Sequence, residues 1–273
     1  MTLSLSIDTT WNYGASLRTY CTASLTLTGT HPSHKDYLHQ RKLAEQLPLD
    51  SFRFDFRGNH ESTGKWSYSD ILGHVADIQT AVDYLKNTFG YVPQLIVSHS
   101  LGSLAAFYWI CHTADGQRLP AFVNVSGRYR MKKLYESTNK WQKSLNEQGY
   151  YELTVPVARK PVTFRIYLND FEKFANWDTA FVWHKFPATT DVLTVHGMSD
   201  ITVPPGDALI YAKALGARRP GTHALHLMEG ADHNFTGHID ELIGSILEWW
   251  ELRRRGGLNT EIWLPHVQES TKL

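Results

Sequence analysis

The chain has 273 residues, of which 42% are hydrophobic and 20% charged, and 27 basic side chains balance 27 acidic ones. This composition is typical of one large globular domain or two small ones and excludes an intrinsically disordered chain. The zero net charge also argues against a polyanion-binding protein, so we expect no nucleic-acid partner.

At the N-terminus, the stretch MTLSLSIDTTWNYG has neither the basic n-region nor the apolar h-region of a secretion signal. The two cysteines, Cys21 and Cys111, are too few for a disulfide framework. No apolar run approaches the ~20 residues that a membrane span requires. We therefore expect a cytoplasmic protein without a membrane span.

From about residue 24, short apolar runs alternate with stretches of helical period, which predicts a mostly parallel sheet covered by helices. Apolar residues repeat at steps of three and four from Ile71 to Phe89, and a similar stripe runs from Ile239 to Trp250. Each stripe predicts a helix with one apolar face. The basic run Arg253–Arg255, followed by Gly256, is typical of a helix C-terminus. The expected strands are 24–29, 51–58, 94–100, 121–127, 191–197 and 223–230.

Residues 128–186 interrupt this rhythm, because they lie between two predicted strands and are far longer than one crossover helix. They are rich in Tyr, Phe and Trp, enough for a small core of their own and for the wall of a ligand pocket. We expect a core domain made of residues 1–127 and 187–273, with residues 128–186 as an inserted cap or lid.

The sequence Val97-Ser-His-Ser-Leu-Gly-Ser103 joins an apolar strand directly to a helical pattern. A catalytic serine on such a strand-to-helix turn has strained backbone geometry, and the residues two before and two after it must be small. Ser98 and Gly102 meet this condition around Ser100. The pattern predicts that Ser100 is a nucleophile, although a serine-rich turn that caps a helix would also fit it.

A serine hydroxyl needs an imidazole to remove its proton and a carboxylate to orient that imidazole. Asp200 follows the predicted strand 191–197, and His233 follows the predicted strand 223–230. Both come after Ser100 in the order serine, acid, histidine, so we expect the three side chains to meet at one edge of the sheet. Other acids are placed less well: Asp191 opens a strand, Asp207 lies within a helix, and Asp232 adjoins the histidine. We expect His99 and His196 to be packed or hydrogen-bonded neighbours.

Acyl transfer also needs backbone N–H donors for the developing oxyanion. One should be that of Leu101, the residue after the nucleophile. The other should come from the turn after strand 24–29, and Thr30 is the expected donor, with His31 as the alternative because Pro32 has no N–H.

With these residues in place, the chain resembles an α/β-hydrolase, in the branch that includes serine aminopeptidase-like hydrolases and cinnamoyl or feruloyl esterases. Asp55–Ser62 matches that family's Asp-x-Arg-Gly-x-x-x-Ser loop, and His196–Pro204 matches its His-Gly-x-x-Asp-x-x-Val-Pro loop. Two positions depart from the family pattern. Thr28 precedes Gly29 where the family has histidine, and Ser98 replaces the glycine that the family has two residues before the serine nucleophile.

The resemblance implies an α/β-hydrolase fold, with a mostly parallel central sheet, helices on both faces and an inserted lid over the acyl pocket. It also implies that Ser100 is the nucleophile, Asp200 the acid and His233 the base. The expected function is a serine esterase that cleaves a small or medium acyl ester through an acyl-enzyme. An amidase or aminopeptidase, a lactonase, a thioesterase or an acyltransferase would use the same three side chains. A ligand-binding protein that kept this fold without turnover is the alternative from another class.

We expect no cofactor and no metal. His223 and His226 lie an odd number of residues apart on a strand and should point to opposite faces, and His31 and His34 lack a third ligand nearby. The expected partner is a small-molecule ester, and the oligomeric state is open, a homodimer included. The C-terminal tripeptide Thr271–Leu273 approximates a peroxisomal Ser-Lys-Leu address, an alternative location in a eukaryotic source.

Overall fold

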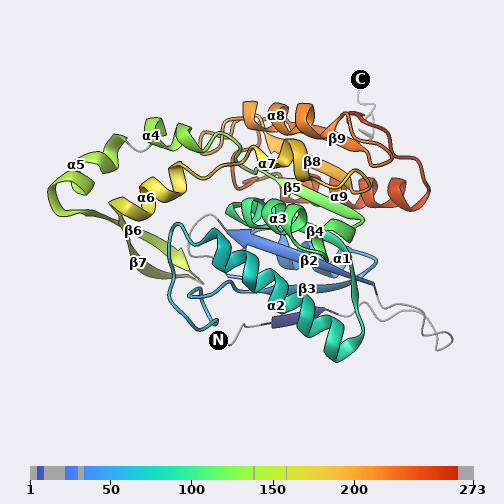
Figure 1. Cartoon of the computed structure of the whole chain (residues 1–273), viewed down its shortest axis with the longest axis horizontal. Helices are drawn as coiled ribbons and strands as arrows, with labels where there is room; N and C mark the ends of the chain where they lie inside the picture. The colour runs from blue at the N-terminus through green and yellow to red at the C-terminus, as the bar shows by residue number, and fades with distance from the viewer. Residues whose placement is uncertain (1–4, 9–21, 30–33, 138, 158, 264–273) are drawn as a thin grey trace, which may run out of the picture.

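The computed structural model describes residues 5–8, 22–29, 34–137, 139–157 and 159–263. Its main sheet has eight strands in the order β1-β3-β2-β4-β5-β8-β9-β10 and crosses the middle of Figure 1. The predicted strands are present as β2 (Thr22–Gly29), β3 (Asp50–Phe54), β4 (Val92–Ser100), β5 (Ala121–Val125), β8 (Asp191–Gly197) and β9 (His223–Met228). Neighbouring strands among these six are parallel, which confirms the predicted sheet.

The two edge strands of this sheet were not predicted. β1 (Leu5–Asp8) pairs antiparallel with β3, and β10 (Glu261–Ile262) pairs parallel with β9. The run predicted as strand 51–58 ends earlier, because the chain turns after Phe54 and Gly58 adopts a left-handed φ of +70°.

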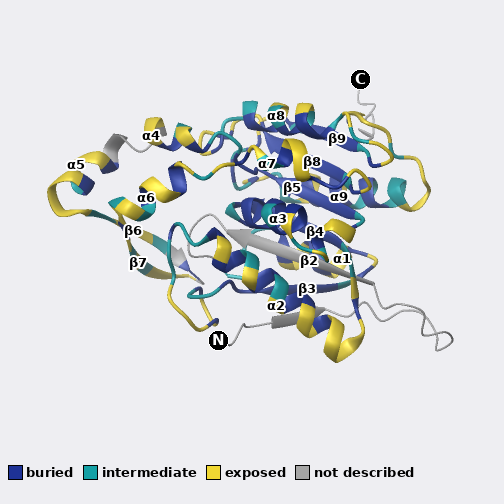
Figure 2. Cartoon of the chain, in the orientation of Figure 1, coloured by how far each residue is buried: buried dark blue, intermediate teal, exposed yellow. Residues whose placement is uncertain are grey.

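Helices cover both faces of the sheet, as predicted. On one face, apolar residues of α2 (Ile71–Phe89), α3 (Leu101–His112) and α8 (Gly206–Leu215) join one buried cluster. On the other face, α1 (Gln40–Gln46) and α9 (Ile239–Arg254) join a second buried cluster. Figure 2 shows the central strands as the most deeply buried part of the molecule.

The helix ends follow the sequence signals. The Asp70 side chain accepts a hydrogen bond from the Gly73 N–H at the start of α2, and Gly90 ends that helix in the left-handed conformation. The last helix ends at Arg254, two residues before Gly256, which has a φ of +69°.

Residues 128–186 contribute no strand to the main sheet, and most of them extend from one end of it, on the left of Figure 1. Ile166 and Phe171 are buried in the same apolar cluster as α2 and α3, so the aromatic-rich segment packs continuously with that cluster. Its elements are the 3₁₀ turn Met131–Lys133, α4 (Leu134–Ser137), α5 (Asn139–Gln148), the antiparallel pair β6 (Tyr150–Val157) and β7 (Lys160–Tyr167), α6 (Leu168–Ala175) and α7 (Phe181–Lys185). A further 3₁₀ turn, Gly116–Arg118, precedes β5.

Among the residues that the structure describes, no helix is both long and apolar enough to traverse a lipid bilayer. Thr30, the expected oxyanion donor, and Thr271–Leu273, the expected targeting tripeptide, lie outside the described residues.

Candidate active site

Ser100 lies on the tight turn where β4 ends and α3 begins. Its backbone has φ +56° and ψ −118°, a strained conformation for a residue other than glycine, as predicted for a nucleophile on such a turn. Ser98 stands where this turn usually has glycine. Its hydroxyl is buried 3.0 Å from the Ser103 Oγ and 3.3 Å from the Val123 carbonyl oxygen. Serine is accommodated there because its one polar group has partners inside the fold.

The structure brings together the three side chains that the sequence singled out. The His233 Nε2 lies 2.9 Å from the Ser100 Oγ, and the His233 Nδ1 lies 2.7 Å from the Asp200 Oδ2. Asp200 and His233 stand on the loops after β8 and β9, at the same edge of the sheet as Ser100, because the carboxyl ends of parallel strands meet there. All three residues are buried to more than nine-tenths.

The second carboxylate oxygen of Asp200 is held by the backbone. The Thr202 and Val203 N–H groups each donate to the Asp200 Oδ1 at 2.8 Å. Burial alone would raise the pKa of Asp200, but the hydrogen bonds from His196 and His233 outweigh it and hold this pKa well below its ordinary value. Asp200 is therefore an ionised, oriented acceptor for the imidazole.

Two further histidines support this pair. The His99 Nε2–H donates to the His233 carbonyl oxygen at 2.8 Å, and burial lowers the pKa of His99 well below its ordinary value. The His196 Nε2–H donates to the Val203 carbonyl oxygen at 2.8 Å and lies 3.3 Å from the Asp200 Oδ2. Both are hydrogen-bonded neighbours, as predicted, and they fix the loops that hold the histidine and the acid.

The competing acids have other partners. Asp191 lies 3.0 Å from the Arg253 Nε, at the opposite end of β8. Asp207 pairs with the Arg130 Nε at 2.5 Å, and Asp232 accepts the N–H groups of residues 234 and 236 on its own turn.

Two backbone N–H groups are candidates for an oxyanion site. Leu101 is the first residue of α3, so its N–H has no acceptor within the helix. Gly29 pairs with Ser100 in the β2–β4 register, so the chain leaves β2 beside the serine. This register is compatible with a donor from the following turn.

The Asp55–Ser62 loop is tied to the neighbouring helix rather than to the serine. The Arg57 guanidinium holds the buried Asp77 of α2 from two nitrogens, at 3.0 Å and 2.7 Å, and the Arg57 N–H donates to the same carboxylate at 2.9 Å. At Gly58, a Cβ atom would lie 2.1 Å from the Trp66 backbone nitrogen, so only glycine fits. The arginine and the glycine of this loop motif are therefore explained by contacts that hold the loop in place.

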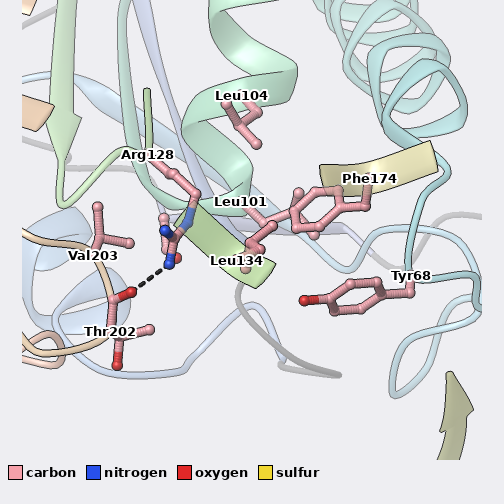
Figure 3. A pocket seen from close by; sticks show the side chains of 9 residues that line it. Tyr68, Leu101, Leu104, Arg128, Leu134, Phe174, Thr202 and Val203 are labelled. Atoms are coloured by element: carbon pink, nitrogen blue, oxygen red, sulfur yellow. Dashed lines mark hydrogen bonds between the residues drawn. The ribbon is translucent and has the colours of Figure 1, made fainter. Parts of the chain in front are cut away.

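A cavity with an empty volume of about 470 Å³, its open mouth included, reaches Ser100. Figure 3 shows Arg128 entering it from one side and Tyr68 directing its hydroxyl into it from the other. Sequence reasoning missed both residues, although Arg128 follows β5 closely, at the sheet edge where open α/β sheets bind ligands. The cavity is lined by Tyr68, Ser100, Leu101, Leu104, Arg128, Leu134, Phe174, Thr202 and Val203.

Among the described residues, the group whose geometry could hold a metal is Asp55, His60 and Glu61, whose ligand atoms lie within 4.8 Å of one another. The Lys35 ammonium already pairs with Glu61 and lies 3.7 Å from Asp55. A lysine cation thus balances one of the two carboxylate charges of this cluster. His223 and His226 bond to different partners, Thr194 and the Trp263 carbonyl.

A mostly parallel sheet covered on both faces, with a serine on the strained turn after a central strand, is typical of an α/β hydrolase. The family model for serine aminopeptidases, S33, matches residues 28–171, more than half of the chain. The chain therefore belongs to this serine aminopeptidase S33 family of α/β hydrolases. The matched stretch includes Ser100 and ends before Asp200 and His233.

The relatives have similar folds at low sequence identity. Est1E from Butyrivibrio proteoclasticus, with ferulic acid bound, has a TM-score of 0.68 at 18% identity and covers 93% of this chain and 96% of its own. The monoacylglycerol lipase of Paleococcus ferrophilus has a TM-score of 0.64 at 17% identity, over 91% of this chain and 98% of its own. These two similarities show the fold.

A curated relative is the uncharacterized protein YDL057W of Saccharomyces cerevisiae, which is 29% identical over 222 residues. The match covers 75% of this chain and 66% of the yeast protein, so the chain spans just under two thirds of that relative's length.

Proposed function

We propose that this hydrolase cleaves carboxylic esters through an acyl-enzyme formed on Ser100, with His233 as base and Asp200 as acid. The observation that carries the proposal is the unbroken line of hydrogen bonds from the Ser100 Oγ through the His233 imidazole to the Asp200 carboxylate, at 2.9 Å and 2.7 Å. A line of this kind is what a serine needs to react as a nucleophile.

In the first half of the reaction, neutral His233 accepts the Ser100 proton at Nε2 while the Oγ forms a bond to the ester carbonyl carbon. Asp200 stabilises the resulting imidazolium through its Nδ1–H. The imidazolium then gives the Nε2 proton to the leaving alkoxide as the bond between the carbonyl carbon and the alcohol oxygen breaks. The acyl group remains on the serine oxygen.

In the second half, a water molecule takes the place of the alcohol. His233 accepts a proton from water, the hydroxide attacks the acyl carbon, and the imidazolium returns a proton to the Ser100 Oγ as the acid leaves. In both halves, the negative charge on the carbonyl oxygen would be stabilised by the Leu101 N–H and by an N–H of the turn after β2, for which Thr30 is our choice.

The described lining of the cavity favours an ester over the substrate of an aminopeptidase. An aminopeptidase must bind a cationic α-ammonium, for which a carboxylate near the serine is the natural partner. None of the described residues that line this cavity is acidic, and its charged side chain is Arg128. Leu134 and Phe174 also line it, which supports a role of residues 128–186 as a cap over the acyl group.

The test is covalent labelling of the folded protein with a fluorophosphonate, followed by mass spectrometry. We expect an adduct on Ser100, no adduct in Ser100→Ala, and loss of short-chain ester turnover in the same variant. Ser103→Ala is the matched control, because it removes the hydroxyl of a neighbouring buried serine outside the proposed mechanism and should still be labelled. Labelling elsewhere, or faster turnover of aminoacyl anilides than of esters, would contradict the proposal.

A further inference from the structure

Arg128 is a buried cation in the same cavity as Ser100. It stands three residues after β5, is 6% exposed, and enters the cavity opposite Tyr68 (Figure 3). Arginine is almost never this buried unless it is paired, because its charge loses the hydration of bulk water. The partners of this guanidinium therefore decide what the cavity can bind.

Within the part of the chain that the structure describes, the guanidinium has one hydrogen-bond partner. Its Nη2 donates to the Thr202 carbonyl oxygen, as the dashed line in Figure 3 shows, and a guanidinium has five N–H donors. Among the described residues, no carboxylate lies within ion-pair distance of it. The nearby carboxylates are engaged elsewhere: Asp200 binds His233, and Asp207 binds the Arg130 Nε.

Burial lowers the pKa of the Arg128 guanidinium, with Asp207 and Asp200 acting against that shift from a distance. The group nevertheless keeps its proton, because arginine remains charged in proteins. The described part of the cavity thus contains a positive charge that the protein itself does not pair.

Tyr68 adds a neutral donor on the opposite wall. It is buried, no described residue is its hydrogen-bond partner, and burial raises the pKa of its phenol, so the hydroxyl stays protonated. Between the two polar groups the lining is apolar, with Leu101, Leu134 and Phe174 (Figure 3). A fitting ligand would be a short apolar chain with an anionic end.

We propose that the substrate is an ester that carries an ionised carboxylate, bound by the Arg128 guanidinium, while the Tyr68 hydroxyl on the opposite wall is a further donor to the ester. This inference rests on the proposed function and names its substrate class. A carboxylate matches the planar fork of a guanidinium and can accept two parallel N–H bonds. The carboxylate and the reacting carbonyl share one cavity, so a short chain joins them, as in the half-ester of a dicarboxylic acid.

A matched pair of substrates tests this. Mono(4-nitrophenyl) adipate and 4-nitrophenyl hexanoate have acyl chains of equal length, which end in a carboxylate and in a methyl group. A second pair, 4-acetoxybenzoate and 4-acetoxybenzamide, places the carboxylate in the alcohol part. We expect the wild-type protein to prefer the anionic member of one pair by its kcat/KM.

In Arg128→Met, the ratio of kcat/KM for the anionic ester to that for its neutral partner should fall roughly 10- to 100-fold, the usual effect of losing a hydrogen-bonded charge pair. Tyr68→Phe should change the ratio less. Lys132→Met is the control, since it removes a positive charge on the same segment from an exposed residue outside the cavity lining and should leave the ratio unchanged.

Arg128 also holds the loop of Asp200 through the Thr202 carbonyl, and a purely structural role would show itself differently. In that case Arg128→Met would slow both esters of a pair equally and leave the ratio intact, which would overturn the inference. No preference in the wild-type protein for either anionic ester would overturn it as well.

Binding measured without turnover keeps the inference separate from the proposed function. Calorimetric titration of Ser100→Ala with both pairs should give tighter binding of the anionic ester than of its neutral partner in one pair, and the added Arg128→Met change should remove the difference. Equal binding within both pairs would refute the carboxylate site even if Ser100 is labelled. A clear difference would support the site even if another residue forms the acyl-enzyme.

Discussion

Replacing Asp200 with asparagine should remove most of the activity while leaving the fold in place. Asp200 uses its two oxygens differently: Oδ1 accepts the Thr202 and Val203 N–H groups at 2.8 Å each, and Oδ2 accepts the His233 Nδ1–H at 2.7 Å. Asparagine has one oxygen and one NH₂ group, so it can keep only one of these two sets of contacts.

The backbone contacts decide which way the amide turns. If the NH₂ group faced the two N–H donors, each would lose its acceptor inside the protein, at a cost of about 1–3 kcal/mol per group. The oxygen should therefore remain at the Oδ1 position. The NH₂ group then faces the His233 Nδ1, which must become an acceptor and leave its proton on Nε2, the atom 2.9 Å from the Ser100 Oγ.

With that tautomer, His233 has no lone pair to receive the serine proton. In serine proteases the same exchange lowers kcat about 10⁴-fold, and we expect a loss of this order for short-chain ester turnover and for the rate of fluorophosphonate labelling. Asp232→Asn is the matched control. Its carboxylate accepts the N–H groups of Asn234 and Thr236, away from the His233 ring, so activity should stay close to wild type.

Urea unfolding of Asp200→Asn should show a folded protein, since the acceptor of the backbone N–H groups is kept. A folded variant whose kcat stays within about tenfold of wild type would refute the proposed tautomer control by Asp200. A large loss in Asp232→Asn would equally count against the assignment of the acid.

Two further predictions concern the fold. Arg57→Met should lower the free energy of unfolding, measured in urea, by about 3–5 kcal/mol, because it leaves the buried Asp77 charge without its guanidinium. The double variant with Asp77→Leu should recover most of the loss. An unchanged urea midpoint in Arg57→Met would contradict this prediction. Acidification from pH 7 to pH 5 should also destabilise the protein. Burial lowers the pKa of His39 and His74 to about 4 and that of His223 to about 3, so the unfolded chain binds protons first as the pH falls below ~6.5. Each of these three histidines should lower the free energy of unfolding by about 2 kcal/mol at pH 5. Equal free energies of unfolding at pH 7 and pH 5 would contradict this.

The sequence predicted those parts of the fold where burial imposes a simple pattern. β4, β5 and β8 lie inside the sheet with helices on both faces, so their residues form continuous apolar runs that are easy to recognise. β10 is a two-residue edge strand, too short to show any period. The β6–β7 pair was missed although its sequence alternates: in β7, Val162, Phe164 and Ile166 are less exposed than the residues between them. This pair stands outside the main sheet, so it has no place in the strand–helix pattern by which the other strands were recognised.

The three residues of the proposed mechanism could be found for a related reason. Ser100 ends a recognisable strand, Asp200 and His233 each follow one, and the carboxyl ends of parallel strands converge. The hydrogen bonds that neighbouring residues make to these three could not be derived from the strand pattern. That His99 donates to the His233 carbonyl depends on how the end of β4 meets a loop 134 residues further along the chain.

Arg128 illustrates what a sequence pattern leaves open. Arg128 and Arg130 are two residues apart, yet one enters the cavity and the other pairs with Asp207. Asp207 accepts the Tyr129 and Arg130 N–H groups at 2.8 Å and 3.1 Å, and the Tyr211 hydroxyl donates to the Arg128 carbonyl at 2.8 Å. These contacts pin the backbone after β5 and so direct Arg128 toward the serine. An acid first considered as a rival to Asp200 is therefore part of what places a cation beside the proposed nucleophile.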